Sequence, residues 1–398
     1  MLSQLRQLIP NWLVNYFWHF PKAILANIFY GFPSKDLKVI GITGTSGKTT
    51  TAHLAYHLLN KNGFKVALIS TISAKIGNKE VDIGLHVTNP EPFVLQKLIK
   101  QIKDQGYQYL VLEVTSHGLA QFRTWGINFD YGVLTNLAHE HLDYHGSLKG
   151  YHQTKLKLIK NSKIAVLNKT DKNFTKALKV VKGKALTFDD LHTSDVCKSL
   201  IGDFNKLNIA AARVIAQDLG VSEKEIKQAL ASFPGIPGRM EIIKPKPFTI
   251  IIDFAHKPDA LELALKSIQK MKAKKGRIIS VFGCAGLRDV KKRPLMGAIS
   301  ARFSDITILT AEDPRTEDVD DIINQIKAGF NKVKTKSKLY IQPDRQKAIN
   351  LAINLAKPND YVCLFGKSHE KSMCFGTIEY PWSEHLAVKK ALKIRSRK

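Results

Sequence analysis

A glycine-rich stretch near the amino terminus contains residue types that bind nucleotide phosphates. It reads Gly44-Thr45-Ser46-Gly47-Lys48-Thr49-Thr50 and follows an apolar run. Glycines let backbone N–H groups turn inward around phosphate oxygens. Lys48 would then reach the β- and γ-phosphates, and the Thr49 hydroxyl would bind Mg²⁺. Because Ile42 stands where the usual phosphate loop has its first glycine, a chance glycine-rich turn is the alternative interpretation.

Carboxylate, imidazole and amide groups follow other apolar runs. Glu113 closes one run, and His141 lies in a histidine-rich segment after the next. A carboxylate and a neutral imidazole beside a triphosphate are reasonable Mg²⁺ ligands, although this ion prefers oxygen. A surface or core histidine is the alternative for His141, and the phosphate loop in the same chain favours the metal site. Asn205 and Asn208 open a predicted helix, where they would either cap it or hydrogen-bond an adenine edge.

Four stretches in the second half of the chain combine charged residues with glycine or proline. Each follows a predicted strand, so together they indicate one shared binding site at neighbouring strand ends. Arginines in such a site suit bidentate recognition of a carboxylate. The four stretches are residues 253–259, 283–289, 312–315 and 366–370.

The elements that must position these residues alternate between strands and helices. The first series predicts a parallel sheet with helices on both faces, whose ligands bind beyond the carboxyl ends of the strands. A second, smaller α/β series follows Gly238, and the proline- and glycine-rich segment 233–238 is a plausible hinge. We therefore predict three parts, residues 1–35, 36–236 and 237–398. The predicted strands are residues 38–42, 65–69, 109–114, 131–135, 164–168, 248–253, 277–283, 305–310 and 361–365.

Length and composition limit the function classes. The chain has 398 residues, more than a usual single core, and a formal net charge of +27. Such an excess of cations suggests acidic partners, namely nucleotides, polyanionic substrates, nucleic acid or an anionic membrane; lysines that merely face water are the alternative. The four cysteines form no Cys-x-x-Cys pair, so we expect neither a zinc ribbon nor a disulfide framework, and a cytoplasmic location fits.

The amino-terminal segment is strongly apolar. Residues 8–31 are rich in aromatic side chains but are interrupted by Pro10, Asn15, His19 and Pro21. These interruptions argue against a transmembrane helix, and no small-residue cleavage site marks a signal peptide. We predict two short amphipathic helices that lie on the protein or make peripheral contact with a membrane.

With these motifs in this order, the chain resembles the Mur ligase family from about residue 36 to the carboxyl terminus. Members are ATP-dependent ligases that add amino acids to the peptidoglycan precursor. The resemblance is strongest to those that add a diamino acid to UDP-N-acetylmuramoyl-L-alanyl-D-glutamate. It implies a central P-loop parallel-sheet ATPase domain and a smaller Rossmann-like α/β carboxyl-terminal domain. The segments that carry it are 44–49, 113–117, 135–137, 141–146, 151–155, 202–208, 237–241, 253–259, 288–289, 292–296, 312–315 and 366–370.

The resemblance also implies roles for individual positions. The catalytic residues are Lys48, Glu113, His141 and Lys155. Thr49 would bind one Mg²⁺, and Glu113, His141 and a carbamylated Lys155 would bind a second. The ATP-binding residues are Gly44, Thr45, Ser46, Gly47, Lys48, Thr49, Thr50, Asn136, Asn205, Asn208, Arg239 and Asp253. The acceptor-binding residues are Thr88, Asn89, Thr115, Gln121 and Arg123. The amino-acid-binding residues are Arg288, Glu312, Asp313, Pro314, Arg315, Gly366 and Glu370.

The implied reaction uses ATP and Mg²⁺ and has two steps. The acceptor carboxylate attacks the γ-phosphate and becomes an acyl phosphate, which the amine of the incoming amino acid then attacks. The two domains are expected to close for this reaction, so the hinge should matter for turnover. The partners implied are a UDP-muramoyl-dipeptide-like acceptor and a diamino acid, with no nucleic acid.

Four features depart from the family pattern. Residues 1–35 leave no room for the family's uridine-binding domain, so the carrier of the acceptor stays open. The usual Asp-Asn-Pro-Arg is Glu312-Asp313-Pro314-Arg315 here, and the retained Arg315 favours a diamino acid with a second carboxylate, such as meso-diaminopimelate, over lysine. Thr115 replaces a serine and keeps the hydroxyl, and Ser368 replaces a glycine.

Two rival interpretations remain at this stage. One is a related ligase with another acceptor, similar to folylpolyglutamate synthase, against which the Asp-Tyr-His-Gly motif at 143–146 argues. The other is a non-catalytic nucleotide-binding protein, against which the retained Lys48, Glu113, His141 and Lys155 argue. Phosphate release that depends on an acceptor would separate these interpretations.

Overall fold

The computed structural model describes residues 10–84, 88–138, 142–190, 197, 199–244, 246–272 and 275–397, without the side chains of residues 142 and 143. The chain divides into two compact units. Unit 1 consists of Met1–Lys198 and Phe204–Phe233, and unit 2 of Ser199–Asp203 and Pro234–Lys398. The final crossing from unit 1 to unit 2 falls within the predicted hinge segment 233–238, whereas the three-part division stays a prediction.

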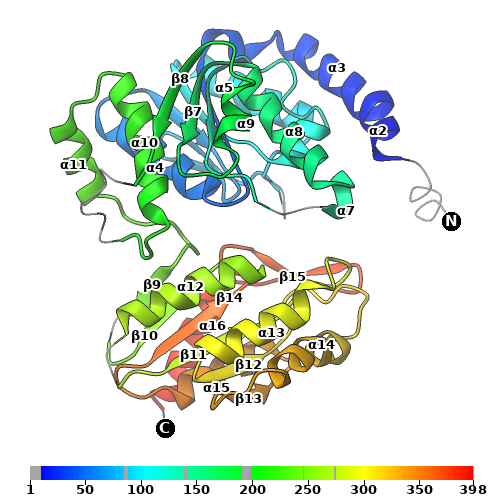
Figure 1. The fold of residues 1–398 in the computed structure, drawn as a ribbon, viewed down its shortest axis with the longest axis vertical. Coiled ribbons are helices and arrows are strands. Elements are labelled where there is room, and N and C mark those ends of the chain that lie inside the picture. Colours follow the sequence, from blue (N-terminus) through cyan, green and yellow to red (C-terminus); the bar gives the residue numbers. More distant parts are fainter. Residues whose placement is uncertain are drawn as a thin grey trace. The chain divides into compact units, whose positions relative to one another are not determined.

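Unit 1 is built on an eight-stranded sheet with the order β4-β3-β2-β5-β1-β6-β7-β8. Figure 1 labels its strands β7 and β8. Strand β1 lies between β5 and β6 and is parallel to both. The five strands predicted for this half of the chain are confirmed, each to within two residues at either end. The strands are β1 Lys38–Thr43, β2 Val66–Ile69, β3 Ala74–Ile76, β4 Lys79–Val81, β5 Tyr109–Glu113, β6 Phe129–Leu134, β7 Ser162–Asn168 and β8 Lys184–Phe188.

Helices pack against this sheet because its strands are apolar on both faces. Val39 belongs to a core cluster with Leu95 and Ile99 of one helix and Leu158 of another. Successive strand residues face opposite sides, so Ile40 points the other way, and it is also fully buried. The helices of unit 1 are α2 Asn11–Val14, η1 Asn15–His19, α3 Phe20–Tyr30, η2 Pro33–Asp36, α4 Lys48–Lys61, α5 Pro92–Asp104, α6 Ser116–Ala120, α7 Leu142–His145, α8 Leu148–Lys160, α9 Phe174–Leu178, α10 Asn205–Asp218 and α11 Glu223–Ala231.

The amino-terminal segment forms one helical rod instead of the two separate helices that the sequence predicted. The α-helices α2 and α3 are joined by the π-helical turn η1, and the residues at both junctions keep right-handed helical angles. Pro21 follows the turn at once; its ring would clash with a carbonyl in a regular α-helix, and a wider turn relieves that clash. No helix among the described residues is long and apolar enough to cross a membrane.

Unit 2 contains a six-stranded sheet with the order β13-β12-β11-β14-β10-β9. The four strands predicted here are confirmed as neighbours β12, β11, β14 and β10, all parallel, while β9 is antiparallel to β10. The strands are β9 Glu241–Lys244, β10 Thr249–Asp253, β11 Ile278–Phe282, β12 Ile306–Leu309, β13 Lys338–Ile341 and β14 Tyr361–Phe365, with a hairpin of β15 Ser372–Phe375 and β16 Ile378–Pro381. The helices are α12 Pro258–Met271, α13 Lys292–Phe303, α14 Val319–Asn331, α15 Arg345–Leu355 and α16 Glu384–Arg395.

Two glycines allow α13 and α14 to pack closely. A Cβ atom on Gly329 would lie 1.8 Å from the carbonyl oxygen of Pro294, and one on Gly297 would lie 2.0 Å from that of Ile326. Both obstacles are backbone atoms, so neither can move aside without separating the helices.

We therefore predict that Gly329→Ala destabilises unit 2. Helix propensity alone would stabilise the variant by about 1 kcal/mol. The backbone clash should outweigh this gain and lower the free energy of unfolding by about 1–3 kcal/mol. Urea denaturation followed by circular dichroism would measure the change, with the exposed Asn331→Ala in the same helix as the control. A Gly329→Ala protein that unfolds at higher urea than the wild type would contradict the close packing.

Candidate active site

The glycine-rich loop between β1 and α4 has a backbone shape that only glycine fits. Gly44 and Gly47 have φ angles of 151° and 81°. A Cβ atom on Gly44 would lie 1.8 Å from Thr135 Oγ1, and one on Gly47 would lie 2.3 Å from Asn208 Oδ1. The Asn136 side chain holds the loop from β6, because its Oδ1 accepts a 3.0 Å hydrogen bond from the Ser46 N–H. Asn136 therefore lies beside the phosphate loop, and its predicted role in binding ATP stays a prediction.

Lys48 and Thr49 begin α4 directly after the loop. Lys48 Nζ donates 3.1 Å hydrogen bonds to the carbonyl oxygens of Gly44 and Thr45, so the ammonium lies over the loop. Thr49 Oγ1 donates to Glu113 Oε1 at 3.0 Å, where β5 ends. The hydroxyl and carboxylate oxygens therefore meet at the point where the helix N-terminus favours negative charge.

A buried lysine from α8 approaches the same loop. Lys155 is 1% exposed, and its Nζ donates a 2.7 Å hydrogen bond to the Gly44 carbonyl oxygen. Burial lowers the pKa of Lys155 well below its usual value, and the Lys48 cation lowers it further, whereas Glu113 opposes the shift. Its Nζ also lies 4.7 Å from the centre of the Tyr151 ring. This amine is therefore prone to lose its charge.

The oxygen atoms at this point fit a magnesium ion better than the unmodified lysine does. Thr49 and Glu113 supply a hydroxyl and a carboxylate, the donor types that Mg²⁺ prefers. The ammonium form of Lys155 would repel a cation, while a carbamate on Nζ would add oxygen ligands. Within the part of the chain that the structure describes, no three His, Cys, Asp or Glu side chains gather as a metal site. His141 lies outside the described residues.

The acceptor residues predicted from the sequence form one hydrogen-bonded cluster. Asn89 Nδ2 donates to the Glu113 carbonyl oxygen at 2.7 Å, and Asn89 Oδ1 accepts from both the N–H and the hydroxyl of Thr115 at 2.9 Å. Arg123 Nη1 donates to the Asn89 carbonyl oxygen at 2.5 Å, and Arg123 Nε donates to Gln121 Oε1 at 2.8 Å. Glu113 is thus shared between the phosphate loop and this cluster.

Thr71 is a site residue that the sequence analysis missed. Its N–H donates to Glu113 Oε2 at 2.9 Å, and its hydroxyl lies 2.9 Å from that of Thr88, the remaining predicted acceptor residue. The sequence could have indicated this residue. Thr71 comes soon after the end of β2, Glu113 is the last residue of β5, and polar residues at the carboxyl ends of strands mark such sites.

The two asparagines of α10 face the start of α4. Asn208 Nδ2 donates to Asn205 Oδ1 at 2.9 Å, and Thr51 Oγ1 donates to Asn208 Oδ1 at 3.3 Å. Neither asparagine is the N-cap of α10, which is Phe204 and makes no side-chain capping bond. The capping interpretation is therefore wrong, and the adenine contact stays a prediction. Thr50 is buried in the first turn of α4.

The predicted ATP residues of unit 2 lie close to each other at the end of β10. Asp253 Oδ2 accepts a 2.7 Å hydrogen bond from the Met240 N–H, and the Arg239 guanidinium lies 4.6 Å from the centre of the Phe254 ring. Burial raises the pKa of Asp253, although the Arg239 cation partly opposes this.

Buried acids and a buried lysine gather where β12 and β14 end. Lys367 Nζ contacts Asp313 Oδ1 at 2.8 Å and Glu370 Oε2 at 2.7 Å, with the lysine side chain fully buried. Glu312 is buried, and its Oε2 has no hydrogen-bond partner among the described residues. Gly366 packs on this carboxylate, because a Cβ atom there would lie 2.6 Å from Glu312 Oε2. Burial raises the pKa of Glu312 to about 7.

The arginine of the Glu312–Arg315 turn lies beside the loop after β11. Arg315 has a left-handed φ of 55°, and its Nη1 donates to the Gly286 carbonyl oxygen at 3.1 Å. Pro314 packs on the same glycine, because a Cβ atom on Gly286 would lie 1.9 Å from the Pro314 carbonyl oxygen. Arg288 lies two residues further along this loop and is exposed. Ser368, which replaces a glycine, has a φ of 51° and donates to the Gly238 carbonyl oxygen at 2.7 Å.

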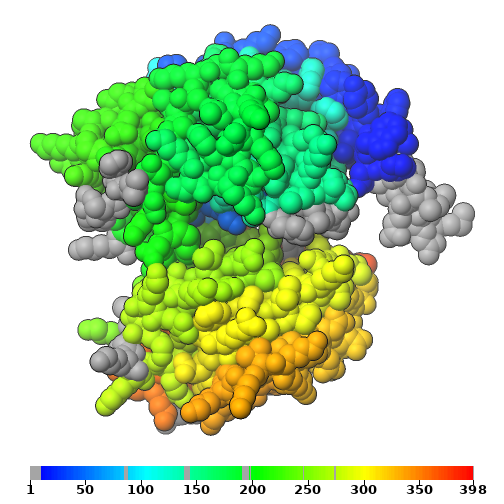
Figure 2. All heavy atoms as spheres, viewed as in Figure 1, coloured from blue at the N-terminus to red at the C-terminus, as the bar shows by residue number. Residues whose placement is uncertain are grey.

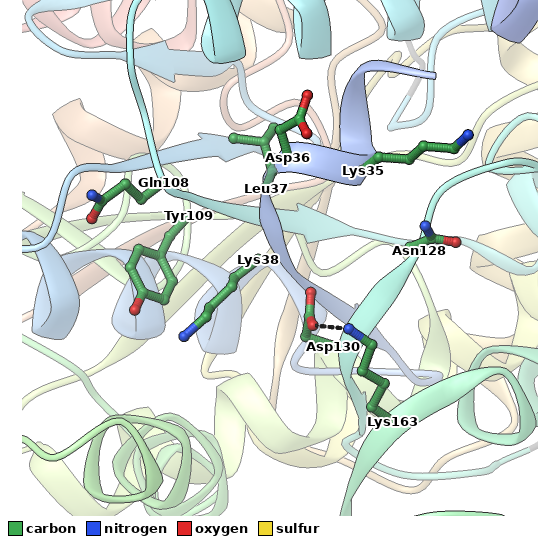
Figure 3. Close-up of a pocket in the computed structure, with 9 residues that line it drawn as sticks. All are labelled: Lys35, Asp36, Leu37, Lys38, Gln108, Tyr109, Asn128, Asp130 and Lys163. Carbon is green, nitrogen blue, oxygen red and sulfur yellow. Dashed lines mark hydrogen bonds and ion pairs between the residues drawn. The ribbon is translucent and has the colours of Figure 1, made fainter. Parts of the chain in front are cut away.

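A separate pocket lies at the opposite end of the unit 1 strands, away from the phosphate loop. It has a volume of about 520 Å³, and Figure 3 shows its ion pair between Lys163 and Asp130. Its lining residues come from the amino ends of β1, β5, β6 and β7, whereas ligands of parallel sheets bind at the carboxyl ends. We therefore do not assign the chemistry to this pocket. The lining residues are Lys35, Asp36, Leu37, Lys38, Gln108, Tyr109, Asn128, Asp130 and Lys163.

Comparisons with known proteins agree with this geometry. Residues 42–199 match the Mur ligase middle domain, and residues 238–368 match the family described as Mur ligase, glutamate ligase domain. The UDP-N-acetylmuramoyl-L-alanyl-D-glutamate--2,6-diaminopimelate ligase of Aquifex aeolicus (strain VF5) is 37% identical over 392 residues, which cover 92% of this chain and 80% of that protein.

Solved structures are also similar. The structure of a UDP-N-acetylmuramoyl-L-alanyl-D-glutamate--2,6-diaminopimelate ligase has a TM-score of 0.61 and 28% identity, and covers 91% of this chain and 79% of that one. E. coli FolC, solved with DHPP and ADP, has a TM-score of 0.72 over 94% of this chain and 93% of that one. Its identity is 19%, so this likeness concerns the fold alone.

We predict that Glu312→Gln stabilises the protein only at higher pH. The folded pKa of about 7 lies above the ordinary value of 4.5, so the stability cost of burying the carboxylate grows as the pH rises from about 4.5 through about 7. Below about pH 4.5 the group is protonated in both states and the cost vanishes. The advantage of the variant should therefore grow from about pH 5 to about pH 8, by up to about 3 kcal/mol.

Urea denaturation at several pH values would measure this difference. The exposed Glu379→Gln serves as the control and should show no such trend. An advantage of Glu312→Gln that stays constant with pH would show that Glu312 is not held in a raised-pKa environment.

Proposed function

The chain belongs to the Mur ligase family of ATP-dependent ligases that form amide bonds, and we propose that it adds a diamino acid to UDP-N-acetylmuramoyl-L-alanyl-D-glutamate. This step belongs to the synthesis of the peptidoglycan precursor. One observation carries the proposal, namely that Glu113 joins the phosphate loop to the acceptor cluster. Its side-chain carboxylate accepts a hydrogen bond from Thr49 beside the loop, and its backbone carbonyl accepts one from Asn89 of the cluster. The named activity of the similar Aquifex aeolicus protein supports the choice of substrates.

The proposed reaction activates a carboxylate and then transfers it. The terminal carboxylate of the acceptor attacks the γ-phosphorus of ATP, ADP leaves, and an acyl phosphate forms. The amine of the incoming amino acid attacks the acyl carbon, the bond to the phosphate oxygen breaks, and an amide, inorganic phosphate and a proton result. Asn89, Thr115 and Arg123 would position the acceptor, and Lys48 would neutralise charge on the phosphates as it develops.

Magnesium would supply further charge neutralisation at the phosphate oxygens. We propose that Thr49 holds one Mg²⁺ and that Glu113, His141 and a carbamylated Lys155 hold a second. The buried position of Lys155 and its lowered pKa support this modification, because a neutral amine adds carbon dioxide and releases a proton. The modification would also replace the like-charge contact between Lys155 and Lys48 by an attraction.

We propose that the second substrate binds where β11, β12 and β14 end. Arg315 would pair with a carboxylate, and Glu312, Asp313 and Glu370 would face an ammonium group. A diamino acid with two carboxylates, such as meso-diaminopimelate, suits this combination better than lysine does. Arg239 and Asp253 of unit 2, with Asn205 and Asn208 of unit 1, would contact the nucleotide.

An assay of phosphate release with product mass tests this function. We expect release only when both the muramoyl-dipeptide nucleotide and a diamino acid are present. Lys48→Met should lower kcat by about 10²–10³-fold, since a phosphate-stabilising charge is lost. The exposed Lys61→Met in the same helix should leave kcat unchanged.

Other outcomes of the same assay point elsewhere. Turnover with a folate-type acceptor and glutamate would support the folylpolyglutamate synthase-like alternative. ATP binding without turnover in the presence of any of these acceptors would support a non-catalytic nucleotide-binding protein.

The amino-acid proposal makes its own prediction. Arg315→Met should lower kcat/KM for meso-diaminopimelate by about 10–100-fold, because a charged hydrogen bond to the second carboxylate is lost. The value for lysine, which lacks that carboxylate, should change little. The exposed Arg302→Met is the matched control. An equal loss for both amino acids would mean that Arg315 does not read the second carboxylate.

A further inference from the structure

The inner face of the amino-terminal rod is fixed by contacts with unit 1. Asn27 is fully buried, and its Nδ2 donates a 2.8 Å hydrogen bond to the Trp125 carbonyl oxygen. The Phe20 ring lies 5.5 Å from the Trp125 ring and 4.7 Å from the Phe122 ring, measured between centroids. Ala23 is buried on the same side. These contacts determine which residues of the rod must face outward.

The outward face of the rod is covered with large apolar side chains. Phe17 and Phe29 are each 73% exposed, although both are aromatic. The Phe29 ring lies 6.2 Å from that of Phe93 in α5, so the apolar surface continues onto the next helix. We call this surface the outer aromatic face, and it comprises Trp12, Phe17, Trp18, Leu25, Ile28, Phe29, Phe93 and Val94. Contiguous apolar surface of this kind marks an interaction site.

The charge around this face favours an anionic partner. The sequence contains no Asp or Glu from Met1 to Lys35. Lys22 Nζ lies 4.6 Å from the centre of the Trp18 ring, and Lys97 is exposed one turn after Phe93. A second copy of the chain would bring another formal charge of +27 against this cationic surface, which opposes self-association.

Aromatic side chains beside lysines, with no acid in the rod itself, are the composition of helices that lie in the headgroup region of a bilayer. The rod itself does not span a membrane, since no described helix meets the length and hydropathy required. Its inner face is already occupied by unit 1, so only the outer aromatic face is available to lipid. Figure 1 shows the rod, α2 and α3 in dark blue, at the margin of unit 1, and the space-filling view of Figure 2 shows atoms of the rod on the surface.

From these observations we propose that the outer aromatic face docks on the surface of an anionic lipid bilayer. The rod then lies parallel to the bilayer, with aromatic rings among the acyl chains near the headgroups and with lysines at the lipid phosphates. Trp12 and Trp18 are on this face, whereas Trp125 packs against the inner side of the rod.

The rod is connected directly to elements of the candidate active site. Asn11 Nδ2 donates to the Tyr144 carbonyl oxygen at 3.2 Å, and the Tyr144 hydroxyl donates to Asn15 Oδ1 at 3.1 Å. Phe122, which stacks on Phe20, stands between Gln121 and Arg123 of the acceptor cluster. If the proposed function holds, docking therefore places the acceptor cluster of unit 1 close to the bilayer.

Vesicle co-sedimentation with the full chain tests the docking without requiring turnover, so its failure is separate from failure of the ligase assignment. We expect binding to vesicles of phosphatidylcholine and phosphatidylglycerol, and weaker binding to phosphatidylcholine alone or at high salt. Phe17→Ser combined with Phe29→Ser should lower the partition coefficient about tenfold or more. Leu263→Ser with Leu386→Ser, two exposed apolar residues of unit 2, is the matched control and should bind as the wild type does.

A second measurement uses the unmodified protein, so it does not depend on the folding of a variant. Brominated lipids should quench the tryptophan fluorescence of vesicle-bound wild type, because Trp12 and Trp18 would reach the acyl chains. The proposal is overturned if the wild type does not bind anionic vesicles, or if binding occurs without quenching. It is also overturned if the Phe17 and Phe29 double variant binds equally well, or if that variant turns a wild-type dimer into a monomer.

Discussion

The Glu113 carboxyl group is the point on which the candidate active site depends. One of its side-chain oxygens accepts from the Thr49 hydroxyl, the other accepts from the Thr71 N–H, and its carbonyl oxygen accepts from Asn89. These bonds are possible because β1 and β2 both flank β5 in parallel, so that three strands end at one edge of the sheet. Removing the carboxylate would therefore remove the bonds to Thr49 and to Thr71, whose hydroxyl contacts Thr88, while the backbone bond to Asn89 would remain.

The positive charge of the lysines at the phosphate loop is the second constraint. Lys48 and Lys155 both donate to the Gly44 carbonyl oxygen, so two amino groups lie close together at one acceptor. The charged form of the buried Lys155 is disfavoured, since burial and Lys48 both lower its pKa. Carbamylation, as proposed, would turn this conflict into a negative group beside a positive one. The same buried environment that makes an ordinary lysine unfavourable thus favours its modification.

Much of the fold could be predicted because buried parallel strands are continuous apolar runs. Strands such as β5 and β14 show this pattern, with polar residues at or soon after their carboxyl ends. The hairpin of β3 and β4 was not predicted, because strands of three residues that include lysine and glutamate give no apolar run. The amino-terminal rod was predicted as two helices, since the sequence shows Pro21 but not the π-helical turn that accommodates it.

The residues of the site could be predicted from the sequence, but the hydrogen bonds between them could not. The motifs placed Asn89, Thr115 and Arg123 together, yet only the folded chain shows that Asn89 links the other two. Burial of Glu312 and the hydrogen bond from Ser368 to Gly238 depend on residues distant in sequence, so no local pattern could reveal them. Thr71 could have been predicted as a site residue, because it is a polar residue soon after an apolar strand.

The most direct test of the proposed reaction is to trace one isotopically labelled oxygen atom. An acceptor labelled with ¹⁸O in its terminal carboxylate would be turned over with ATP and the amino acid, and the released phosphate would be analysed by mass spectrometry. If the carboxylate attacks the γ-phosphorus, one labelled oxygen must leave with each phosphate. Phosphate that carries no label from the acceptor would mean that the carboxylate is not activated by phosphorylation, and the proposed reaction would be wrong.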